Sequence, residues 1–402
     1  MSKQHDVVIV GGGLVGASLA IALDRAGRDV GLVEAAGGQG MPPVFDQRNL
    51  SFAAATVNAL TALGVMQQLQ APTGAIARIH VSRRGDFGRI VLEAADYGRQ
   101  AFGQVVVASD FGQALERSLA LAGGITRYRP ARFEALAGLD DGSRRIRISG
   151  PDGTQALSAR LLVGADGSAS QVRDALGIGA QEYDYGQTLC VARMRAERAP
   201  DGTAYERLTG DGPTAVLPRG DRHYGVIHAV PSAQADAVAA LTPAQWCARI
   251  QDAFGWRVGR FFESGERSAY AIRQRVAERL TAPRAVLMGN AAQTLHPVGA
   301  QGFNLGLRDA LTLAELIQAS DDPGNATLLE TYLQRRGEDR RRTLAFSDGL
   351  ARLTSSDVPL MAPLRSLGLL VAGQASWVQA MLAGGGMGFR GHVPALCREE
   401  AA

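Results

Sequence analysis

Apolar and glycine-rich stretches in the N-terminal segment follow one another in the order strand, turn, helix, strand. The apolar run Val7–Val10 ends in three glycines, and apolar residues then recur with helical periodicity from Leu14 to Ala26. Gly27 ends this predicted helix, and Val30–Glu34 follows as a second strand. The pattern therefore predicts a β-α-β unit, in which two parallel strands are joined by a helix.

The remainder of the chain mixes predicted helices with shorter alternating segments. Helical patterns occupy residues 46–69, 111–122 and 303–319. Alternating or short apolar segments predict strands at 76–81, 103–107, 146–163 (two strands joined by a tight turn), 215–217, 224–230 and 285–288.

We predict an α/β fold with two intertwined domains and a tail, because the strand-rich middle third interrupts the predicted β-α-β architecture. The expected boundaries are 1–75, 104–180 and 283–345 for a Rossmann-like nucleotide-binding domain, 76–103 and 181–282 for an inserted antiparallel-sheet substrate domain, and 346–402 for a helical, Gly-rich C-terminal tail.

Composition and charge exclude several classes of function. The 42 basic and 39 acidic residues are interspersed and leave a net charge of +3, so nucleic-acid binding has little support. The densest basic run, Arg340–Arg342, follows Glu338 and Asp339 and predicts a solvated helix face. The three cysteines lie far apart, which argues against a disulfide framework, a dithiol redox centre and a metal site. The N-terminus lacks the apolar stretch of a secretory signal, so we expect a cytoplasmic protein.

The C-terminal tail has no charged residue between Arg365 and Arg390. Ser, Gln and Gly residues within this stretch disfavour a membrane-spanning helix. An amphipathic helix is expected instead, with apolar positions at Leu367, Leu370, Val371, Val378, Met381 and Leu382. Two interpretations stay open: the apolar side packs on the body of the protein, or it binds a membrane surface.

Gly11, Gly13 and Gly16 form a Gly-x-Gly-x-x-Gly motif at the turn between the first predicted strand and helix. Such glycines permit a sharp turn, close approach of the backbone to a pyrophosphate and close packing of helix on strand. The helix start offers free N–H groups and a partial positive charge to phosphates. Glu34 ends the second strand, where it would bind a ribose diol and repel a 2′-phosphate. The motif therefore favours FAD or NAD over NADP.

Two later segments have a related form, in which a strand is followed by a short polar residue beside glycine. Asp166 occupies this position in segment 162–173, and Asn290 occupies it in segment 286–306. Ligand contacts in an open α/β sheet concentrate where strands end. We therefore expect both residues to contact the nucleotide.

In this order and at these separations, the three segments resemble those of FAD-dependent aromatic hydroxylases of the p-hydroxybenzoate hydroxylase fold, along nearly the whole chain. Within that group, Phe45–Arg48, Ala59–Val65 and Gly289–Pro297 resemble the ubiquinone-biosynthesis hydroxylases, above all those that act on 2-polyprenyl-6-methoxyphenol. Most of the wider family has Asp-Ala-Ala-His where this chain has Asn290–Gln293, and this departure marks the subgroup.

The resemblance implies that FAD is the cofactor and that its ADP half contacts the glycine motif and Glu34. Arg48 would approach the pyrophosphate, and Asn290, beside Gly289, would bind the ribityl or phosphate region.

The resemblance also implies which residues surround the isoalloxazine ring. Loop 297–302 would lie at the ring, with the following helix aimed at it so that backbone N–H groups stabilise the anionic reduced flavin. Asp166 and Arg173 match positions that touch both FAD and the incoming pyridine nucleotide. The residues expected at this helix start are Gly302, Phe303 and Asn304.

The implied reaction is hydroxylation of the aromatic ring of a polyprenyl phenol through a flavin C4a-hydroperoxide, with O2 as co-substrate. NAD(P)H would bind transiently as electron donor, or a partner reductase would supply the electrons. The candidates for catalytic residues are His296 and Pro297 in the flavin loop and His228 on a predicted strand, with Tyr224 as a weaker candidate.

Other interpretations stay open on the sequence alone. The enzyme could hydroxylate another phenol, or reduce prenyl double bonds with the same fold. A third interpretation is a non-catalytic flavin-binding scaffold. The partners expected from the resemblance are the polyprenyl phenol and a quinone-biosynthesis multienzyme complex, at the inner face of the cytoplasmic membrane if the tail binds lipid.

Overall fold

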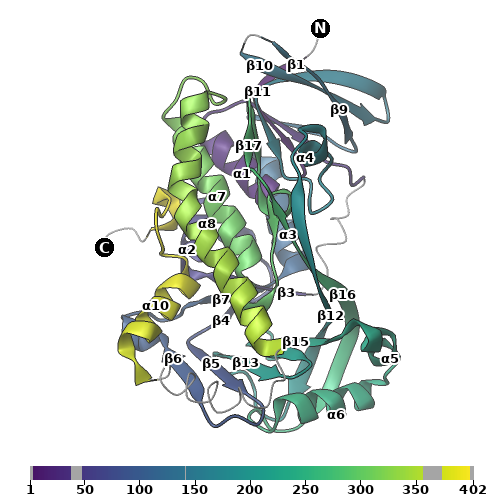
Figure 1. Ribbon diagram of the computed structural model, residues 1–402, viewed down its shortest axis with the longest axis vertical. Helices are drawn as coiled ribbons and strands as arrows, with labels where there is room; N and C mark the ends of the chain where they lie inside the picture. Colours follow the sequence, from purple (N-terminus) through teal and green to yellow (C-terminus); the bar gives the residue numbers. More distant parts are fainter. Residues whose placement is uncertain (1–2, 38–47, 141, 356–373, 399–402) are drawn as a thin grey trace.

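The computed structural model describes residues 3–37, 48–140, 142–355 and 374–398. Two large sheets occupy the two ends of the long axis, and helices α7 (Gln301–Gln318) and α8 (Ala326–Ser355) run beside each other along one side (Figure 1). The α/β class with an inserted antiparallel sheet is confirmed.

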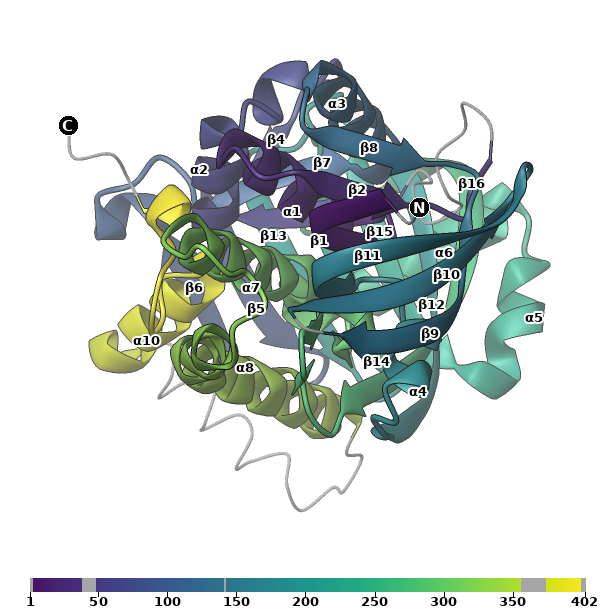
Figure 2. The ribbon, with the colours of Figure 1, turned by 90° about the horizontal axis from the view of Figure 1, so that it is seen from above.

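The first sheet contains the predicted β-α-β unit, with α1 (Leu14–Arg25) between its two strands. Its central strands are parallel and buried, so they read as continuous apolar runs without alternation. Figure 2 shows the strands in succession, with α7 and α8 to one side. The strand order is β17 (Thr281–Ala282), β18 (Ala285–Leu287), β11 (Gly153–Gly164), β1 (Lys3–Val10), β2 (Val30–Val33) and β8 (Ile125–Tyr128), with β10 (Ser143–Gly150) and β9 (Arg132–Asp140) extending from β11.

The second sheet is mainly antiparallel, and one of its faces packs on α6 (Pro243–Phe254) through Trp246, Ile250 and Phe254. The opposite face is turned toward the loops of the first sheet. The strand order is β19 (Gln293–Thr294), β16 (Phe261–Ala277), β12 (Ala180–Ala196), β15 (Tyr224–Pro231), β14 (Gly212–Pro218), β13 (Thr203–Thr209), β5 (Arg78–Arg83) and β6 (Arg89–Glu93). The domain boundaries given above stay a prediction.

A third, small sheet corrects one expectation from the sequence. It consists of β3 (Asn49–Ala53), β7 (Gly103–Val107) and β4 (Gly74–Ala75). The prediction of a helix throughout 46–69 is wrong, because Asn49–Ala53 pairs with β7 and the helix α2 covers only Ala54–Ala62. The segment Asn49–Ala53 contains only one alanine and one leucine, and its pairing with β7 decides its conformation over the local preference of the surrounding sequence.

The remaining helices complete the core and cover the sheets. Helices α1, α3 (Ala108–Leu121) and α7 pack together on the first sheet. Helix α10 (Ser376–Met387) buries Ala383 and Met387 among apolar residues of β6 and its neighbours. The other short helices are α4 (Gln171–Ala175) and α5 (Ala235–Ala239).

The described part of the predicted tail helix is therefore packed on the body along one side, whereas Met381 is 52% exposed. The predicted apolar positions Leu367, Leu370 and Val371 lie outside the described residues. In the described ranges no helix has both the length and the apolar character needed to cross a membrane.

A buried ionic network joins α7 to α8 and corrects the expectation of a solvated face at 338–342. Arg308 donates to Asp339 at 2.8 Å, and Arg336 donates to both Asp339 and Asp309 at 2.6 Å. These four side chains are at most 2% exposed. Burial raises the pKa of Asp339, but the two arginines outweigh this effect and hold the pKa below its usual value. Within the charged run, Glu338, Arg341 and Arg342 face solvent, whereas Asp339 is buried and Arg340 is partly buried, because a helix turns its residues to different sides.

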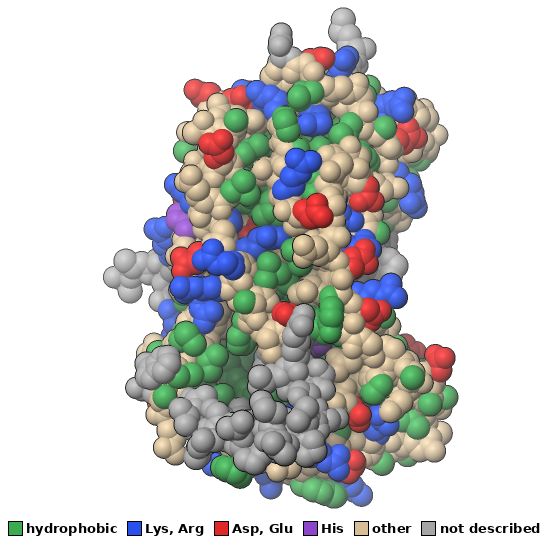
Figure 3. Space-filling view, in the orientation of Figure 1, with side chains coloured by type: hydrophobic (Ala, Val, Ile, Leu, Met, Phe, Trp, Pro, Cys, Tyr) green, Lys and Arg blue, Asp and Glu red, His purple; other side chains and the backbone are tan. Residues whose placement is uncertain are grey.

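The charges on the surface are mixed. Figure 3 shows basic and acidic side chains next to one another over much of the visible face. Many of them form exposed ion pairs, such as Arg342 with Glu338. Pairs of this kind contribute little to stability.

Candidate active site

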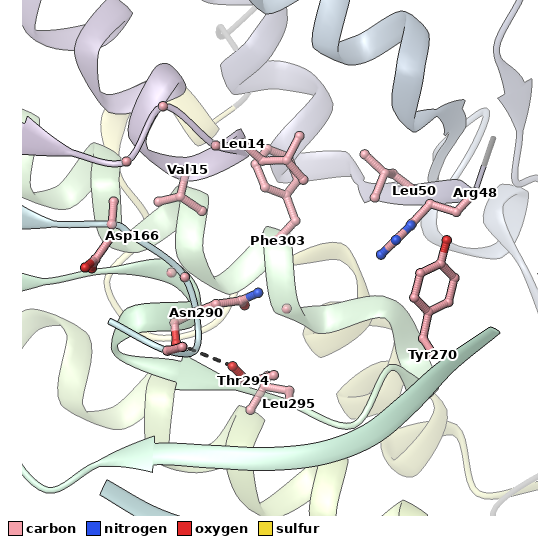
Figure 4. Close-up of a pocket in the computed structure, with 18 of the residues that line it drawn as sticks. Leu14, Val15, Arg48, Leu50, Asp166, Tyr270, Asn290, Thr294, Leu295 and Phe303 are labelled. Atoms are coloured by element: carbon pink, nitrogen blue, oxygen red, sulfur yellow. Dashed lines mark hydrogen bonds between the residues drawn. The ribbon is translucent and has the colours of Figure 1, made fainter. Parts of the chain in front are cut away.

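A cavity of about 980 Å³ lies between the first two sheets. Its walls come from the loops after β1, β11 and β18, the start of α7 and one face of the second sheet (Figure 4). The predicted site residues that line it are Gly11, Gly13, Glu34, Arg48, Asp166, Gly289, Asn290, His296, Pro297, Gly302 and Phe303. Gly16, Arg173, Asn304 and His228 are described and lie outside this lining.

The three glycines of the motif have different structural tasks. Gly11 has φ +109°, and a Cβ there would lie 2.3 Å from the carbonyl oxygen of Ala165. A Cβ on Gly16 would lie 1.9 Å from the carbonyl oxygen of Gly11. Gly13 is the N-cap residue of α1 and has no side chain that could cover the helix start, and a Cβ there would meet no protein atom within 4 Å. Gly11 and Gly16 therefore allow the turn to form, while Gly13 leaves the helix N-terminus open to an anion.

Glu34 is 6% exposed and is held by two arginines that the sequence analysis did not single out. Arg127 donates to Glu34 Oε2 at 2.7 Å, and Arg129 lies 3.5 Å from the same oxygen. Both arginines also contact Glu116. The arginines sit at the end of β8, so the strand-end rule would have indicated them if 125–128 had been predicted as a strand.

Asp166 lines the cavity and organises the loop after β11. It accepts hydrogen bonds from Ser170 Oγ at 2.5 Å and from the backbone N–H of Val172 at 3.1 Å. Arg173 is buried behind this loop and donates to the carbonyl oxygens of Ser168 and Ala291. It therefore ties the loops after β11 and β18 together and does not reach the cavity from its position in this structure.

The start of α7 forms the second open helix N-terminus at the cavity. Its N-cap residue, Ala300, has a left-handed conformation with φ 51° and makes no side-chain cap. A Cβ on Gly302 would meet no protein atom within 4 Å, so a ligand can approach the backbone closely. Figure 4 shows Phe303 on this helix and Asn290 on the neighbouring loop, both at the cavity.

Asn304 has a structural position beneath that helix start. Its Oδ1 accepts from the backbone N–H of Ala53 and from Thr56 Oγ1, at 2.9 and 2.7 Å. Its Nδ2 donates to the carbonyl oxygens of Ser51 and Ala300. All four hydrogen bonds that the amide can make are thus used: three fasten α7 to β3 and α2, and the fourth holds the N-cap residue of α7 itself.

Arg48 and Tyr270 meet at the cavity from opposite sides. The guanidinium of Arg48 lies 3.9 Å from the centroid of the Tyr270 ring (Figure 4). Tyr270 belongs to β16 and was not identified from the sequence. The contact connects the segment before β3 with the second sheet at the cavity wall.

His296 is fully buried in the loop before α7, and its hydrogen bonds fit an uncharged imidazole ring. Its Nδ1 accepts from the backbone N–H of Val298 at 3.1 Å, so the ring proton resides on Nε2, which faces Gln187 Oε1 at 3.5 Å. Burial lowers its pKa to about 4, and the carboxylate of Asp348 opposes this effect only in part. His296 therefore orders its loop and presents no free lone pair, while Pro297 beside it lines the cavity.

His228 lies on the opposite face of the second sheet from the cavity. Side chains alternate along a strand, so Ile227 lines the cavity whereas His228 and Tyr224 face α6. Thr214 Oγ1 and Arg249 Nε contact its two ring nitrogens at 2.8 and 3.3 Å. The geometry gives neither residue a contact with a ligand in the cavity, so we do not carry them forward as catalytic residues.

Acidification should weaken the fold because two buried histidines, His228 and His296, bind protons readily only after unfolding. Burial lowers the pKa of each to about 4. An unfolded histidine has a pKa of about 6.5. The free energy of unfolding therefore keeps its full value above that pH and decreases as the pH drops toward 4. We expect a loss of about 2 kcal/mol per histidine at pH 5, measured by urea unfolding. His228→Gln should show a shallower pH dependence, and equal slopes for the two proteins would contradict this account.

The described residues fit a flavin dinucleotide. Two uncapped helix N-termini, those of α1 and α7, open on one cavity and suit the diphosphate and an anionic ring. The buried carboxylate of Glu34 lies at the end of β2, where a ribose diol would be bound. Gly13 and Gly302 leave the backbone accessible at both ends.

Comparison with known proteins identifies the family. The sequence matches the FAD binding domain family over residues 4–347. It is 34% identical over 373 residues to the ubiquinone hydroxylase UbiL of Rhodospirillum rubrum, covering 91% of this chain and 86% of that one. It is 30% identical over 387 residues to the 3-demethoxyubiquinol 3-hydroxylase of Escherichia coli, covering 93% and 96%.

The fold is likewise similar to solved structures. The p-nitrophenol 4-monooxygenase of Pseudomonas putida superposes with a TM-score of 0.79 over 97% of this chain and 100% of that one, at 19% identity. At this identity the likeness concerns the fold. Because the sequence matches run along nearly the whole chain, the protein belongs to the FAD-dependent ubiquinone hydroxylases, a family of flavin monooxygenases.

Proposed function

We propose that this enzyme hydroxylates the aromatic ring of a polyprenyl phenol of the 2-polyprenyl-6-methoxyphenol type in ubiquinone biosynthesis. The observation that carries the proposal is a single cavity that joins the nucleotide loops to an apolar wall. A substrate ring can lie between the two without burying an unpaired charge on that wall. The apolar wall residues, contributed mainly by the second sheet, are Leu189, Val191, Leu217, Ile227 and Ile272.

The residues that would hold FAD follow from the site geometry. Gly13 and the N-terminus of α1 would bind the diphosphate, and Glu34 would bind the ribose. Asn290 and the backbone at Gly302 would contact the remainder of the cofactor. When bound, FAD supplies the redox chemistry that activates O2, with NAD(P)H or a partner reductase as the source of electrons.

The surrounding residues order the site. Asp166 and Arg173 hold the loops after β11 and β18 in register. His296 and Asn304 fix the loop and the helix start at the other end of the cavity. A fixed, largely apolar lining favours transfer of oxygen to the ring over side reactions with water.

The direct test is incubation of the FAD-loaded enzyme with a short-chain 2-prenyl-6-methoxyphenol, NAD(P)H and isotopically labelled O2. We expect one labelled oxygen atom in the product, detected by mass spectrometry. Release of hydrogen peroxide with unchanged phenol would contradict the proposal. A demethoxyubiquinol offered in parallel tests the activity that is named for the Escherichia coli relative.

Oxygen consumption separates hydroxylation from the other interpretations. A prenyl reductase would oxidise NAD(P)H without using O2, and a scaffold would use neither. Analysis of the quinone intermediates in a deletion strain then gives the ring position, because the phenol that accumulates lacks the oxygen this enzyme adds.

We also propose that the enzyme acts at a membrane surface, within a complex of quinone-biosynthesis enzymes. The support is chemical: a polyprenyl substrate resides in lipid, and Met381 and Leu396 near the C-terminal end are 52% and 39% exposed. Sedimentation with anionic vesicles tests this, and Met381→Glu should reduce the bound fraction. Equal binding by both proteins would contradict a role for this surface.

A further inference from the structure

One face of α8 holds the cavity loop between β18 and α7 from behind. The residues at 336, 340, 343 and 347 recur at helical spacing and therefore point to the same side of the helix. Arg340 Nε donates to Gln293 Oε1 at 2.9 Å, and Ser347 Oγ donates to the carbonyl oxygen of His296 at 3.0 Å. Two points of one loop are thus bonded to one helix at positions about two turns apart.

Gln293 is the residue at which three structural elements meet. Its side chain is buried, and its Nε2 donates to Asp309 Oδ2 of α7 at 3.0 Å while its Oε1 accepts from Arg340 of α8. Its backbone pairs with Val276 of β16 in the second sheet. Asp309 is in turn fixed by Arg336 of the buried ionic network.

An amide side chain satisfies these two partners at once. Arg340 can only donate hydrogen bonds, and the carboxylate of Asp309 can only accept them. A residue between them must accept on one side and donate on the other. Glutamate would place a second carboxylate against Asp309, and lysine would place a cation against Arg340. Glutamine at position 293 meets this requirement without carrying a charge.

The residues that flank Gln293 face the cavity. Asn290, Thr294 and Leu295 line it, and Thr294 Oγ1 donates to the carbonyl oxygen of Asn290 at 3.4 Å (Figure 4). Gln293 itself lies behind them. A displacement of Gln293 would consequently move the groups that contact the cavity, without removing any of them.

We propose that Gln293 is a positioning residue for the flavin: its side chain fixes the loop 290–297 relative to the N-terminus of α7. This inference rests on the flavin site described under the proposed function. Arg340 and Asp309 act on the cofactor through Gln293, and the ionic network between α7 and α8 provides the fixed base.

The test is Gln293→Met, which preserves length and removes both hydrogen bonds. We expect the apo-protein to bind FAD about tenfold more weakly, measured by quenching of flavin fluorescence, because the loop 290–297 is no longer held in place before FAD binds. The absorption bands of the bound flavin should shift, and a larger share of the reduced O2 should appear as hydrogen peroxide. Unchanged affinity, spectrum and coupling would overturn the proposal.

Thr343→Val is the matched control for plain structural damage. Thr343 lies on the same face of α8 and donates to Asp339 Oδ1 at 3.3 Å, and this hydrogen bond does not involve the loop. We expect FAD affinity and spectrum to be unchanged in this variant, whatever its melting temperature. If it reproduces the flavin effects of Gln293→Met, the role of Gln293 is structural and the proposal fails.

Arg340→Gln is a second variant at a partly exposed position, which removes only the contact from α8. It should shift the flavin spectrum and affinity in the same direction and by less, and no shift would count against the proposal. Failure of the parent protein to bind FAD would refute the flavin site itself, so the two hypotheses are tested separately.

Discussion

Gly13→Glu should leave the protein folded and reduce FAD affinity by more than about 100-fold, because a carboxylate would stand where α1 offers its N–H groups to the diphosphate. The added side chain starts in open space, since a Cβ at this position meets no protein atom within 4 Å. Titration of the apo-protein with FAD measures the affinity, and circular dichroism with a melting curve measures the fold.

Two further variants serve as controls for that result. Gly13→Ala should weaken binding moderately, since a methyl group separates the backbone from the diphosphate. Gly16→Ala should instead lower the melting temperature, because its Cβ would lie 1.9 Å from the carbonyl oxygen of Gly11. If Gly13→Glu bound FAD as tightly as the parent protein, the glycine motif would not be the diphosphate site.

Asp339→Asn should destabilise the protein by about 3 to 5 kcal/mol, since it leaves a buried arginine without its charged partner. Arg308 donates to Asp339 from a position that is 1% exposed, and Arg336 donates to the same carboxylate. Asparagine keeps the shape of the side chain, so the effect comes from the charge and its hydrogen bonds. Equilibrium unfolding in urea measures the free energy.

Glu338→Gln is the matched control, because it makes the same chemical change at the adjacent residue. Glu338 and its partner Arg342 are 48% and 57% exposed. This substitution should change the free energy of unfolding by less than about 0.5 kcal/mol. Equal unfolding midpoints for the two variants would mean that the network between α7 and α8 contributes no more than a surface ion pair.

The parts of the site that could be predicted from the sequence are those encoded over short distances. Gly11, Gly13 and Glu34 belong to one β-α-β unit, and Asp166 and Asn290 each follow a strand, so local patterns place them at a sheet edge. The α/β class followed from the same patterns. The resemblance to a flavin hydroxylase family then indicated that these segments bind one cofactor, FAD.

The parts that could not be predicted depend on contacts between distant segments. His228 is turned away from the cavity by the register of β15, which no local pattern reveals. Asn304 and Arg173 are close in sequence to residues that line the cavity, but their side chains form hydrogen bonds with backbone carbonyl groups of other segments. Arg340 belongs to a charged run typical of a surface, yet it reaches Gln293 because α8 packs on α7.

The interleaving of the two large sheets along the chain has a consequence for biosynthesis. Strands β1, β2, β8 and β11 are translated early, but β18, which pairs with β11, emerges only after β12 to β16 have been made. The α7 helix that completes the flavin pocket follows later still. Until β18 is made, the nascent chain therefore has an incomplete parallel sheet with an open edge next to β11. During this time aggregation competes with folding. Cofactor supply can assist folding only after the ribosome has passed α7.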